Sequence, residues 1–148
     1  MRLCSLLFLA CNLPNPRYTS LMSGKPNILI VDDSNTIRRT VELLLAKQGY
    51  KVSTAVDGYA AFQAISQNPP DLIFLDVQMD TLGGLHTCQV IKKNPRYKHI
   101  PVIMLTGNDK IVDRAKARHA GADFLLGKPF TLEDLVAVIK KYLEPVAA

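Results

Sequence analysis

Short runs of large apolar residues recur between Asn27 and Leu143, separated by longer stretches in which apolar residues return every three or four positions. The clearest run is 72–75, Leu-Ile-Phe-Leu, which shows no polar alternation and ends directly on Asp76. Such a run is typical of a strand buried on both faces, as in a parallel sheet covered by helices. Along the chain, the pattern predicts strands at 27–31, 51–55, 72–76, 101–105 and 123–126.

The stretches between these strands have the periodicity of amphipathic helices. They predict helices at 35–48, 59–68, 85–94, 110–120 and 131–143. Local signals mark several helix ends, because Ser34 suits an N-cap, Gly49 suits a C-cap, and 131–134 has the character of a capping box. Five strand–helix units with short connections require a parallel sheet with right-handed crossovers. We therefore predict an α/β fold in one domain.

Size and composition agree with one soluble domain. The chain has 148 residues, of which 48% are hydrophobic and 21% charged, and its net charge is +5. No apolar run approaches the roughly 20 residues of a membrane-spanning helix, so we expect no membrane contact. The basic residues are scattered over helical faces, so we expect no nucleic-acid binding. Cys4, Cys11 and Cys88 lack metal-ligand spacing, which indicates reduced thiols and a cytoplasmic location.

The first 23 residues differ from the rest of the chain. One charge precedes an apolar run from Leu3 to Cys11, and the prolines that follow break any helix. The match to a lipoprotein export signal is poor. We expect 1–23 to be a disordered extension or a mis-assigned start ahead of Met22, and the domain to comprise 24–148, with no output module after it.

Polar residues end or follow four of the five predicted strands: Asp32, Asp33, Asp76, Thr106 and Lys128. In a parallel sheet these ends meet at one edge, where open α/β folds bind their ligands. Three carboxylates there would repel one another and raise at least one pKa, unless a cation lies among them. Each residue alone also suits a helix cap or a solvated surface, but their joint placement favours a functional site.

These residue types fit phosphoryl transfer to a carboxylate. A hard divalent cation with carboxylate, carbonyl and water ligands describes Mg²⁺. A Zn²⁺ site is disfavoured, because the three histidines fall on or near predicted helices, away from this edge. Mg²⁺ beside a carboxylate nucleophile suits formation of an aspartyl phosphate. We predict Asp76 as the acceptor, with Lys128, Thr106 and a backbone N–H of Gly107 or Gln78 stabilising the phosphoryl oxygens.

At these motifs the chain resembles the response-regulator receiver family, from Lys25 to about Leu143. The matching motifs are Ile-Leu-Ile-Val-Asp-Asp-Ser at 28–34, the strand that ends on Asp76, Thr106-Gly107, Gly-Ala-Asp at 121–123 and Lys-Pro-Phe at 128–130. The resemblance implies the (βα)5 flavodoxin-like fold, a doubly wound parallel sheet with strand order 2-1-3-4-5.

The resemblance also implies how the site works. Asp76 would be the phosphoacceptor; Asp33 and Asp76 would bind Mg²⁺ directly, together with the Gln78 backbone carbonyl, and Asp32 would bind it through water. Such a domain is not an enzyme, although it assists its own phosphorylation and slow dephosphorylation.

Two further residues resemble family positions, Thr106 the switch threonine and Lys128 the invariant lysine. Family members hold the bond corresponding to Lys128–Pro129 in the cis form. The implied partners are a histidine kinase or its phosphotransfer domain, and a downstream protein that docks on the fourth helix, fifth strand and fifth helix. The domain would be a monomer or a transient dimer.

A finer resemblance lies in 32–39 and 87–94, which are similar to stand-alone receivers of the PilG/PilH twitching-motility type. We therefore predict a single-domain two-component response regulator that accepts a phosphoryl group on Asp76 and signals through a protein partner in type IV pilus twitching motility. The alternatives are a chemotaxis or flagellar type of receiver, and an interaction module that works without phosphorylation. A phosphohydrolase is disfavoured because Gln78 stands where such enzymes carry a second carboxylate, and a flavodoxin-type cofactor site because Asp32 and Asp33 would repel phosphate.

Two positions depart from the family pattern. The loop 79–84 lacks the usual proline, and Asp80 adds a negative charge to it. The switch aromatic three residues before Lys128 is replaced by Leu125, while Phe124 stands one residue earlier and is predicted to face the opposite side of the strand. We expect that Asp76 is still phosphorylated, and that the usual coupling between the aromatic residue and Thr106 is altered.

Overall fold

The computed structural model describes residues 24–79, 81–107 and 110–143, with the backbone alone for 110–113. The predicted extension 1–23 and Asp80 lie outside the described residues. The elements, in chain order, are β1 (Asn27–Val31), α3 (Asn35–Lys47), β2 (Lys51–Ala55), α4 (Gly58–Gln67), β3 (Leu72–Asp76), α5 (Gly84–Lys93), β4 (Val102–Thr106), α6 (Lys110–His119), β5 (Phe124–Gly127) and α7 (Leu132–Leu143). The predicted alternation of strands and helices is confirmed.

The fourth and fifth strands each begin one residue later than predicted. Pro101 has no N–H to donate to the ladder, and its carbonyl accepts the N–H of Ile73 before β4 begins. Asp123 also stays outside its strand, because its carboxylate accepts the N–H of Val102 at 2.8 Å. Both strands also end one residue later than predicted: Thr106 is the last residue of β4, paired with Gly127, and Lys128 follows β5 directly.

The five strands form one parallel sheet in the order β2-β1-β3-β4-β5, which confirms the predicted topology. The register pairs Val31 with Leu75, Leu75 with Met104, and Met104 with Leu125. The carboxyl ends of β1, β3, β4 and β5 therefore lie at the same edge of the sheet. The central strands β1, β3 and β4 are buried along their whole length, as continuous apolar runs predict.

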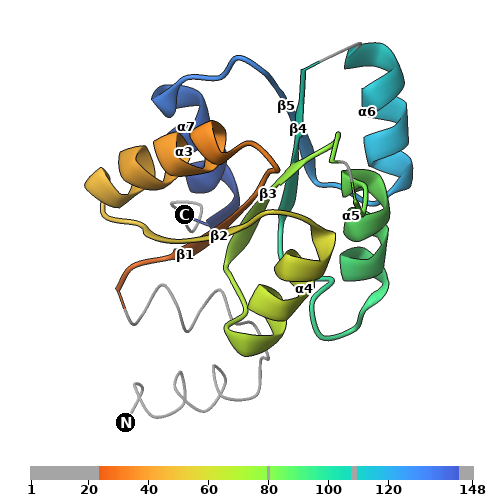
Figure 1. Cartoon of the computed structure of the whole chain (residues 1–148), viewed down its shortest axis with the longest axis horizontal. Coiled ribbons are helices and arrows are strands. Elements are labelled where there is room, and N and C mark those ends of the chain that lie inside the picture. Colours follow the sequence, from red (N-terminus) through yellow and green to blue (C-terminus); the bar gives the residue numbers. More distant parts are fainter. Residues whose placement is uncertain (1–23, 80, 108–109, 144–148) are drawn as a thin grey trace, which may run out of the picture.

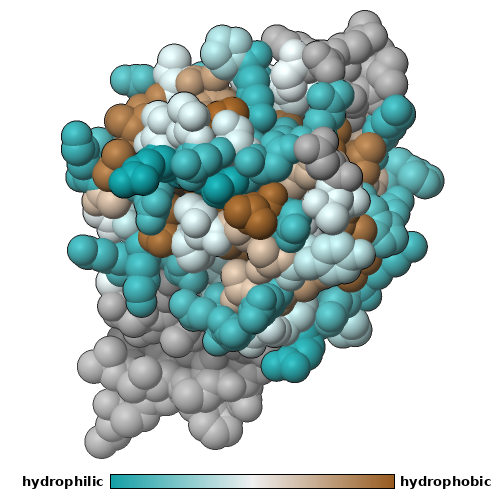
Figure 2. Space-filling model, viewed as in Figure 1, coloured by the Kyte–Doolittle hydropathy of each residue, from teal (hydrophilic) through white to brown (hydrophobic). Residues whose placement is uncertain are grey.

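Helices cover both faces of the sheet (Figure 1). Helices α3 and α7 pack on one face around Phe74 and Ile30, and α4, α5 and α6 pack on the other around Leu75 and Cys88. Hydrophilic residues occupy most of the surface seen in Figure 2, with small hydrophobic patches between them. None of the helices in the described part of the chain combines the length and apolar character needed to cross a bilayer.

The helix ends follow the predicted capping signals. The Ser34 hydroxyl accepts the N–H of Ile37 at 3.4 Å at the start of α3. Thr131 and Asp134 exchange backbone–side-chain hydrogen bonds of 2.9 and 3.1 Å at the start of α7, as in a capping box. Gly49 has a φ of +91°, the left-handed conformation that a helix C-terminus requires and that glycine adopts without steric cost.

Candidate functional site

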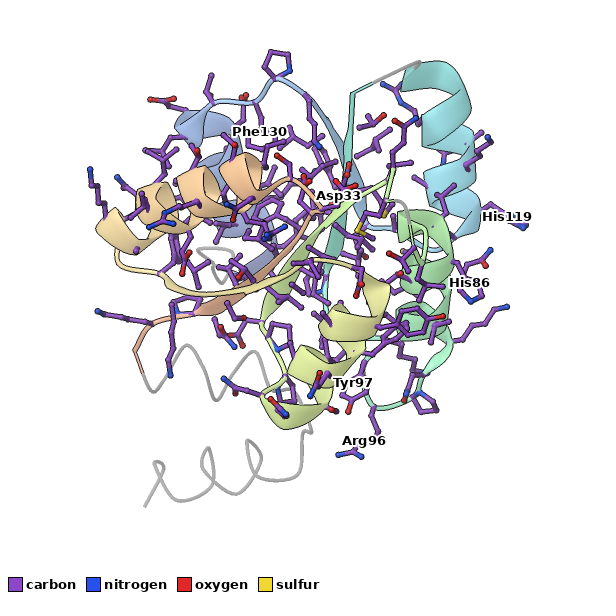
Figure 3. All side chains as sticks on the ribbon, in the orientation of Figure 1. Asp33, His86, Arg96, Tyr97, His119 and Phe130 are labelled. Atoms are coloured by element: carbon purple, nitrogen blue, oxygen red, sulfur yellow. The ribbon has the colours of Figure 1, made fainter. Side chains whose placement is uncertain are left out.

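Three aspartates meet at the carboxyl edge of the sheet. Asp76 ends β3, while Asp32 and Asp33 follow β1, its neighbour in the sheet. Each offers a carboxylate oxygen, and these oxygens lie within 4.8 Å of one another. Asp32 and Asp76 are buried, whereas Asp33 is exposed, in the centre of the view in Figure 3. The topology thus brings the predicted carboxylates together.

Lys128 reaches into this cluster from the end of β5. Its ammonium donates hydrogen bonds to Asp32 Oδ2 at 3.0 Å and to Asp76 Oδ1 at 3.1 Å. The Lys128 backbone N–H donates to the carbonyl of Thr106 at 2.6 Å, which fixes the end of β5 against the end of β4. The Lys128–Pro129 peptide bond is cis, as the family resemblance implies.

The remaining predicted residues lie around Asp76. Thr106 is buried at the end of β4, the strand next to β3. The Gln78 backbone N–H donates a hydrogen bond to the Asp76 carboxylate. Gly107 follows Thr106 and is exposed. The structure therefore gathers all the predicted site residues at one edge. Of the loop 79–84, Asp80 lies outside the described residues.

Burial and the Lys128 ammonium shift the pKa of Asp76 in opposite directions. Burial raises its pKa most, the Asp32 charge raises it further, and hydrogen bonding and charge from Lys128 lower it; the net pKa lies above the ordinary value. For Lys128, burial by itself lowers the pKa, but its hydrogen bonds and charge interactions with Asp32 and Asp76 outweigh burial and raise it. The ammonium therefore stays charged at neutral pH.

The donor set suits a hard divalent cation. Three carboxylates face one ammonium, so the cluster carries excess negative charge. The pKa of Asp76 is raised mainly by burial and then by the charge of Asp32. A cation among these oxygens would offset that repulsion, and oxygen-only ligands at a partly open edge fit Mg²⁺. His86 and His119 lie far from Asp33, on the outer side of α5 and α6 (Figure 3). Among the described residues, the group of side chains that could hold a metal ion here contains no histidine.

Glycine is required where α5 passes the site. A Cβ on Gly84 would collide with the backbone carbonyl of Asp76 and crowd the Cα of Val77, whereas a Cβ on Gly83 would meet nothing. The Gly84 N–H also donates to the Val77 carbonyl at 3.2 Å. The sequence analysis placed Gly84 only in a loop and missed this contact; a Gly-Gly pair shortly after a functional aspartate was the available signal.

Phe124 and Leu125 face opposite sides of β5, which confirms the predicted alternation. Phe124 packs with the α7 side of the core, and its ring lies 6.4 Å from that of Tyr142 in an edge-to-face arrangement. Leu125 packs against the cluster on the α4, α5 and α6 side. Leu125 thus stands at the position where the receiver family usually carries an aromatic residue, and it faces the side of the sheet covered by α4, α5 and α6.

Comparisons with known proteins agree with this geometry. The model of the response regulator receiver domain matches residues 28–140. Protein PilG of Pseudomonas aeruginosa is 46% identical over 116 residues, which cover 78% of this chain and 86% of that protein. Response regulator MprA of Mycobacterium sp. (strain KMS) is 38% identical over 116 residues, or 78% of this chain and 50% of that relative, so the chain spans half of its length.

Solved structures agree as well. The chemotaxis protein CheY4 of Vibrio cholerae superposes with a TM-score of 0.77 at 32% identity, covering 80% of this chain and 99% of that one. The two chains therefore share the same fold over most of their length.

Proposed function

Because the chain belongs to the response regulator receiver family, we propose that Asp76 accepts a phosphoryl group from a histidine kinase or from its phosphotransfer domain. Receiver domains are the phosphoacceptor domains of two-component systems, they are generally not enzymes, and they interact with histidine kinases and downstream proteins. The observation that carries the proposal is the buried Asp76 carboxylate, with the Lys128 ammonium 3.1 Å away and two further carboxylates beside it.

Asp76 is suited to act as a nucleophile. A carboxylate oxygen forms the new bond to phosphorus, and the bond from phosphorus to the imidazole nitrogen of a phosphohistidine breaks as the imidazole leaves. Lys128 is placed to bind a phosphoryl oxygen, because its ammonium already contacts the acceptor. Thr106, at the end of the neighbouring strand, and the backbone N–H groups of Gln78 and Gly107 are further donors for the transferred group.

Asp32, Asp33, Asp76 and the Gln78 carbonyl would hold Mg²⁺. When bound, the ion supplies positive charge to the oxygens of the phosphoryl group. The chain supplies the rest: Lys128 neutralises part of the charge that the transfer brings into the site, and burial of Asp76 excludes water from one side of the acceptor.

We propose that the signal leaves through the surface of α6, β5 and α7, in the cytoplasm. The basic side chains on α6 and α7 favour an acidic partner; those in the described part are Arg114, Lys116, Arg118, Lys140 and Lys141. The side chain of Lys110, at the start of α6, lies outside the described residues. The domain would act as a monomer or a transient dimer.

The likeness to PilG supports an output in type IV pilus twitching motility. The structural likeness to CheY4 keeps a chemotaxis type of output as the second candidate. Pull-down of partners with beryllofluoride-treated and untreated protein separates the two, because it identifies the protein that binds only the phosphorylated form.

Labelling tests the proposed acceptor. Incubation with acetyl phosphate or a phosphorylated kinase should give an acid-stable, base-labile label on the wild type and none on Asp76→Asn. Persistent label on the variant would refute the assignment. If neither protein is labelled and beryllofluoride treatment does not change partner binding, the result would support the alternative of an interaction module that works without phosphorylation.

A further inference from the structure

Every polar atom of Asp32 has a hydrogen-bond partner. Its N–H donates to the Ala55 carbonyl at 3.2 Å, its Oδ1 accepts the N–H of Ser34 at 2.9 Å, and its Oδ2 accepts the Lys128 ammonium at 3.0 Å. The fourth atom, the backbone carbonyl, accepts a hydrogen bond of 2.6 Å from Nη1 of Arg38. This last contact comes from the first turns of α3 and has no role in the proposed chemistry.

The carbonyl that Arg38 holds belongs to the peptide unit joining Asp32 to Asp33. Because a peptide unit is planar, fixing its oxygen fixes the orientation of the plane and with it the direction in which the Asp33 side chain leaves the backbone. Asp33 is exposed and follows the strand, so neighbouring side chains restrain it little. The guanidinium is therefore placed to set the position of one proposed metal ligand relative to the other.

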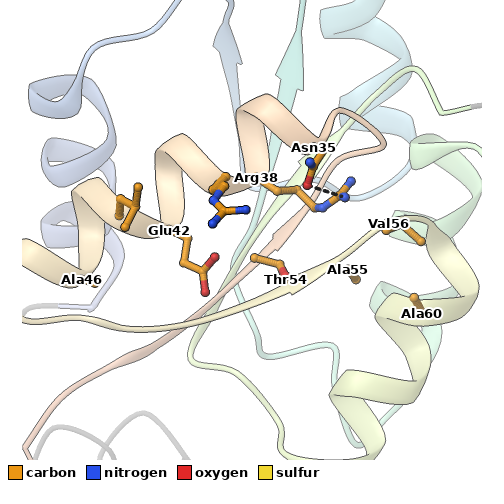
Figure 4. Close-up of a pocket in the computed structure, with 10 residues that line it drawn as sticks. Asn35, Arg38, Glu42, Ala46, Thr54, Ala55, Val56 and Ala60 are labelled. Carbon is orange, nitrogen blue, oxygen red and sulfur yellow. Dashed lines mark hydrogen bonds between the residues drawn. The ribbon is translucent and has the colours of Figure 1, made fainter.

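Arg38 is itself anchored. Its second guanidinium nitrogen lies 3.4 Å from Oδ1 of Asn35, the contact drawn in Figure 4, and its backbone N–H donates to the Ser34 carbonyl at 3.1 Å. A planar guanidinium with several fixed donors holds two acceptors at once, which a lysine ammonium on a flexible stem does less well. Arg38 is half-buried, so its hydrogen bonds are partly protected from water.

We propose that Arg38 is a positioning residue for the Mg²⁺ site: by binding the Asp32 carbonyl it holds the Asp32–Asp33 turn in the geometry that binds the ion. This inference rests on the proposed function, because it concerns the same site. Residues that orient metal ligands typically change metal affinity by 10- to 100-fold when they are replaced. We expect a loss of about tenfold for Arg38→Ala.

The direction of the change in Mg²⁺ affinity distinguishes a positioning role of Arg38 from the effect of its charge alone. Removal of a positive charge near a cation site strengthens cation binding, whereas loss of the restraint weakens it. Arg39 provides the matched control. It is the next residue of α3, and it is exposed and lines the same groove of about 580 Å³ between α3 and β2 (Figure 4). Its side chain makes no hydrogen bond or ion pair with the residues that the structure describes.

Calorimetric titration of the full chain with MgCl2 tests the inference, with thermal unfolding in EDTA to show that each variant is folded. Arg38→Ala should bind Mg²⁺ about tenfold more weakly, Arg39→Ala should bind as tightly as the wild type or more tightly, and the two should unfold at similar temperatures in EDTA. If Arg38→Ala does not fold, Arg38→Gln retains an N–H donor and should show a smaller loss in the same direction.

Three results would overturn the inference. Arg38→Ala that binds Mg²⁺ as tightly as the wild type removes the positioning role and leaves the proposed function intact. An equal loss in Arg39→Ala assigns the effect to the groove as a whole. A wild type that does not bind Mg²⁺ overturns the proposed metal site as well, so the two failures are distinguishable.

Discussion

The ammonium of Lys128 lies 3.1 Å from the carboxylate of Asp76, although 52 residues separate them in the chain. The contact depends on topology, because Asp76 ends β3, Lys128 follows β5, and only β4 lies between these strands in the sheet. It joins an acceptor whose pKa is raised by burial to a cation whose pKa is raised by its acidic neighbours. The proposed chemistry needs both groups in their charged forms at neutral pH.

Mg²⁺ should stabilise the wild type against heat. A ligand that binds only the folded state adds about 1.4 kcal/mol at ten times its Kd, which corresponds to roughly 3–6 °C in Tm for a domain of this size. Asp33→Asn should lose most of this shift, because it removes one proposed ligand. Glu133→Gln, an exposed carboxylate at the start of α7, should keep it. Equal shifts in all three proteins, measured by calorimetry with MgCl2 and with EDTA, would count against the metal site.

Asp76→Asn should raise the stability of the metal-free protein at neutral pH. The pKa of Asp76 is raised on folding, so the folded state binds the proton more tightly than the unfolded state. Wild-type stability therefore falls as the pH rises from the ordinary value of 3.8 through the raised folded pKa, and the loss is complete above it. Urea unfolding in EDTA at several pH values should show this fall for the wild type and a smaller one for Asp76→Asn. The opposite slope would mean that Lys128 outweighs burial.

Gly84→Ala should destabilise the protein by about 1–3 kcal/mol or more, because the new methyl group meets the backbone of Asp76, which cannot move without disturbing β3. Gly83→Ala tests the neighbouring position, where a methyl group meets nothing and φ is −61°. That variant should stay within about 1 kcal/mol of the wild type. Urea unfolding of both variants measures the difference, and similar stabilities would show that the start of α5 shifts freely.

Cys88 should resist thiol reagents in the folded protein. Burial raises its pKa to about 11, so about one thiol in a thousand is ionised at pH 8, against roughly a quarter in an unfolded chain. In a protein with Cys4→Ser and Cys11→Ser, the rate of reaction with a disulfide reagent should be slow and should increase on addition of urea. Rapid reaction at pH 8 without urea would place the thiol at the surface.

Much of the fold and site was predictable because the signals are local or topological. Apolar runs located the strands, short connections required a parallel sheet, and a parallel sheet brings strand ends such as Asp33 and Asp76 to one edge. The contacts that position these residues were not predictable. The Arg38 hydrogen bond to the Asp32 carbonyl and the passage of Gly84 over Asp76 depend on side-chain and backbone directions that periodicity does not specify.

The start of β4 shows the same limit. The apolar pattern includes Pro101, but a proline cannot donate to the ladder, so the strand begins at Val102. At the other end Thr106, which the pattern left outside the strand, pairs with Gly127 of β5 and is the final residue of β4. The one-residue difference matters for the site, because it places the proposed switch threonine inside the sheet and not in the following loop.

The most direct test of the account is to locate the phosphoryl group itself. The protein is treated with acetyl phosphate and MgCl2, reduced with borohydride to trap any acyl phosphate, digested, and analysed by mass spectrometry. The account predicts modification of one residue, Asp76, and none in a sample that contains EDTA. Modification of Asp32 or Asp33 with Asp76 intact, or modification that does not depend on Mg²⁺, would contradict it.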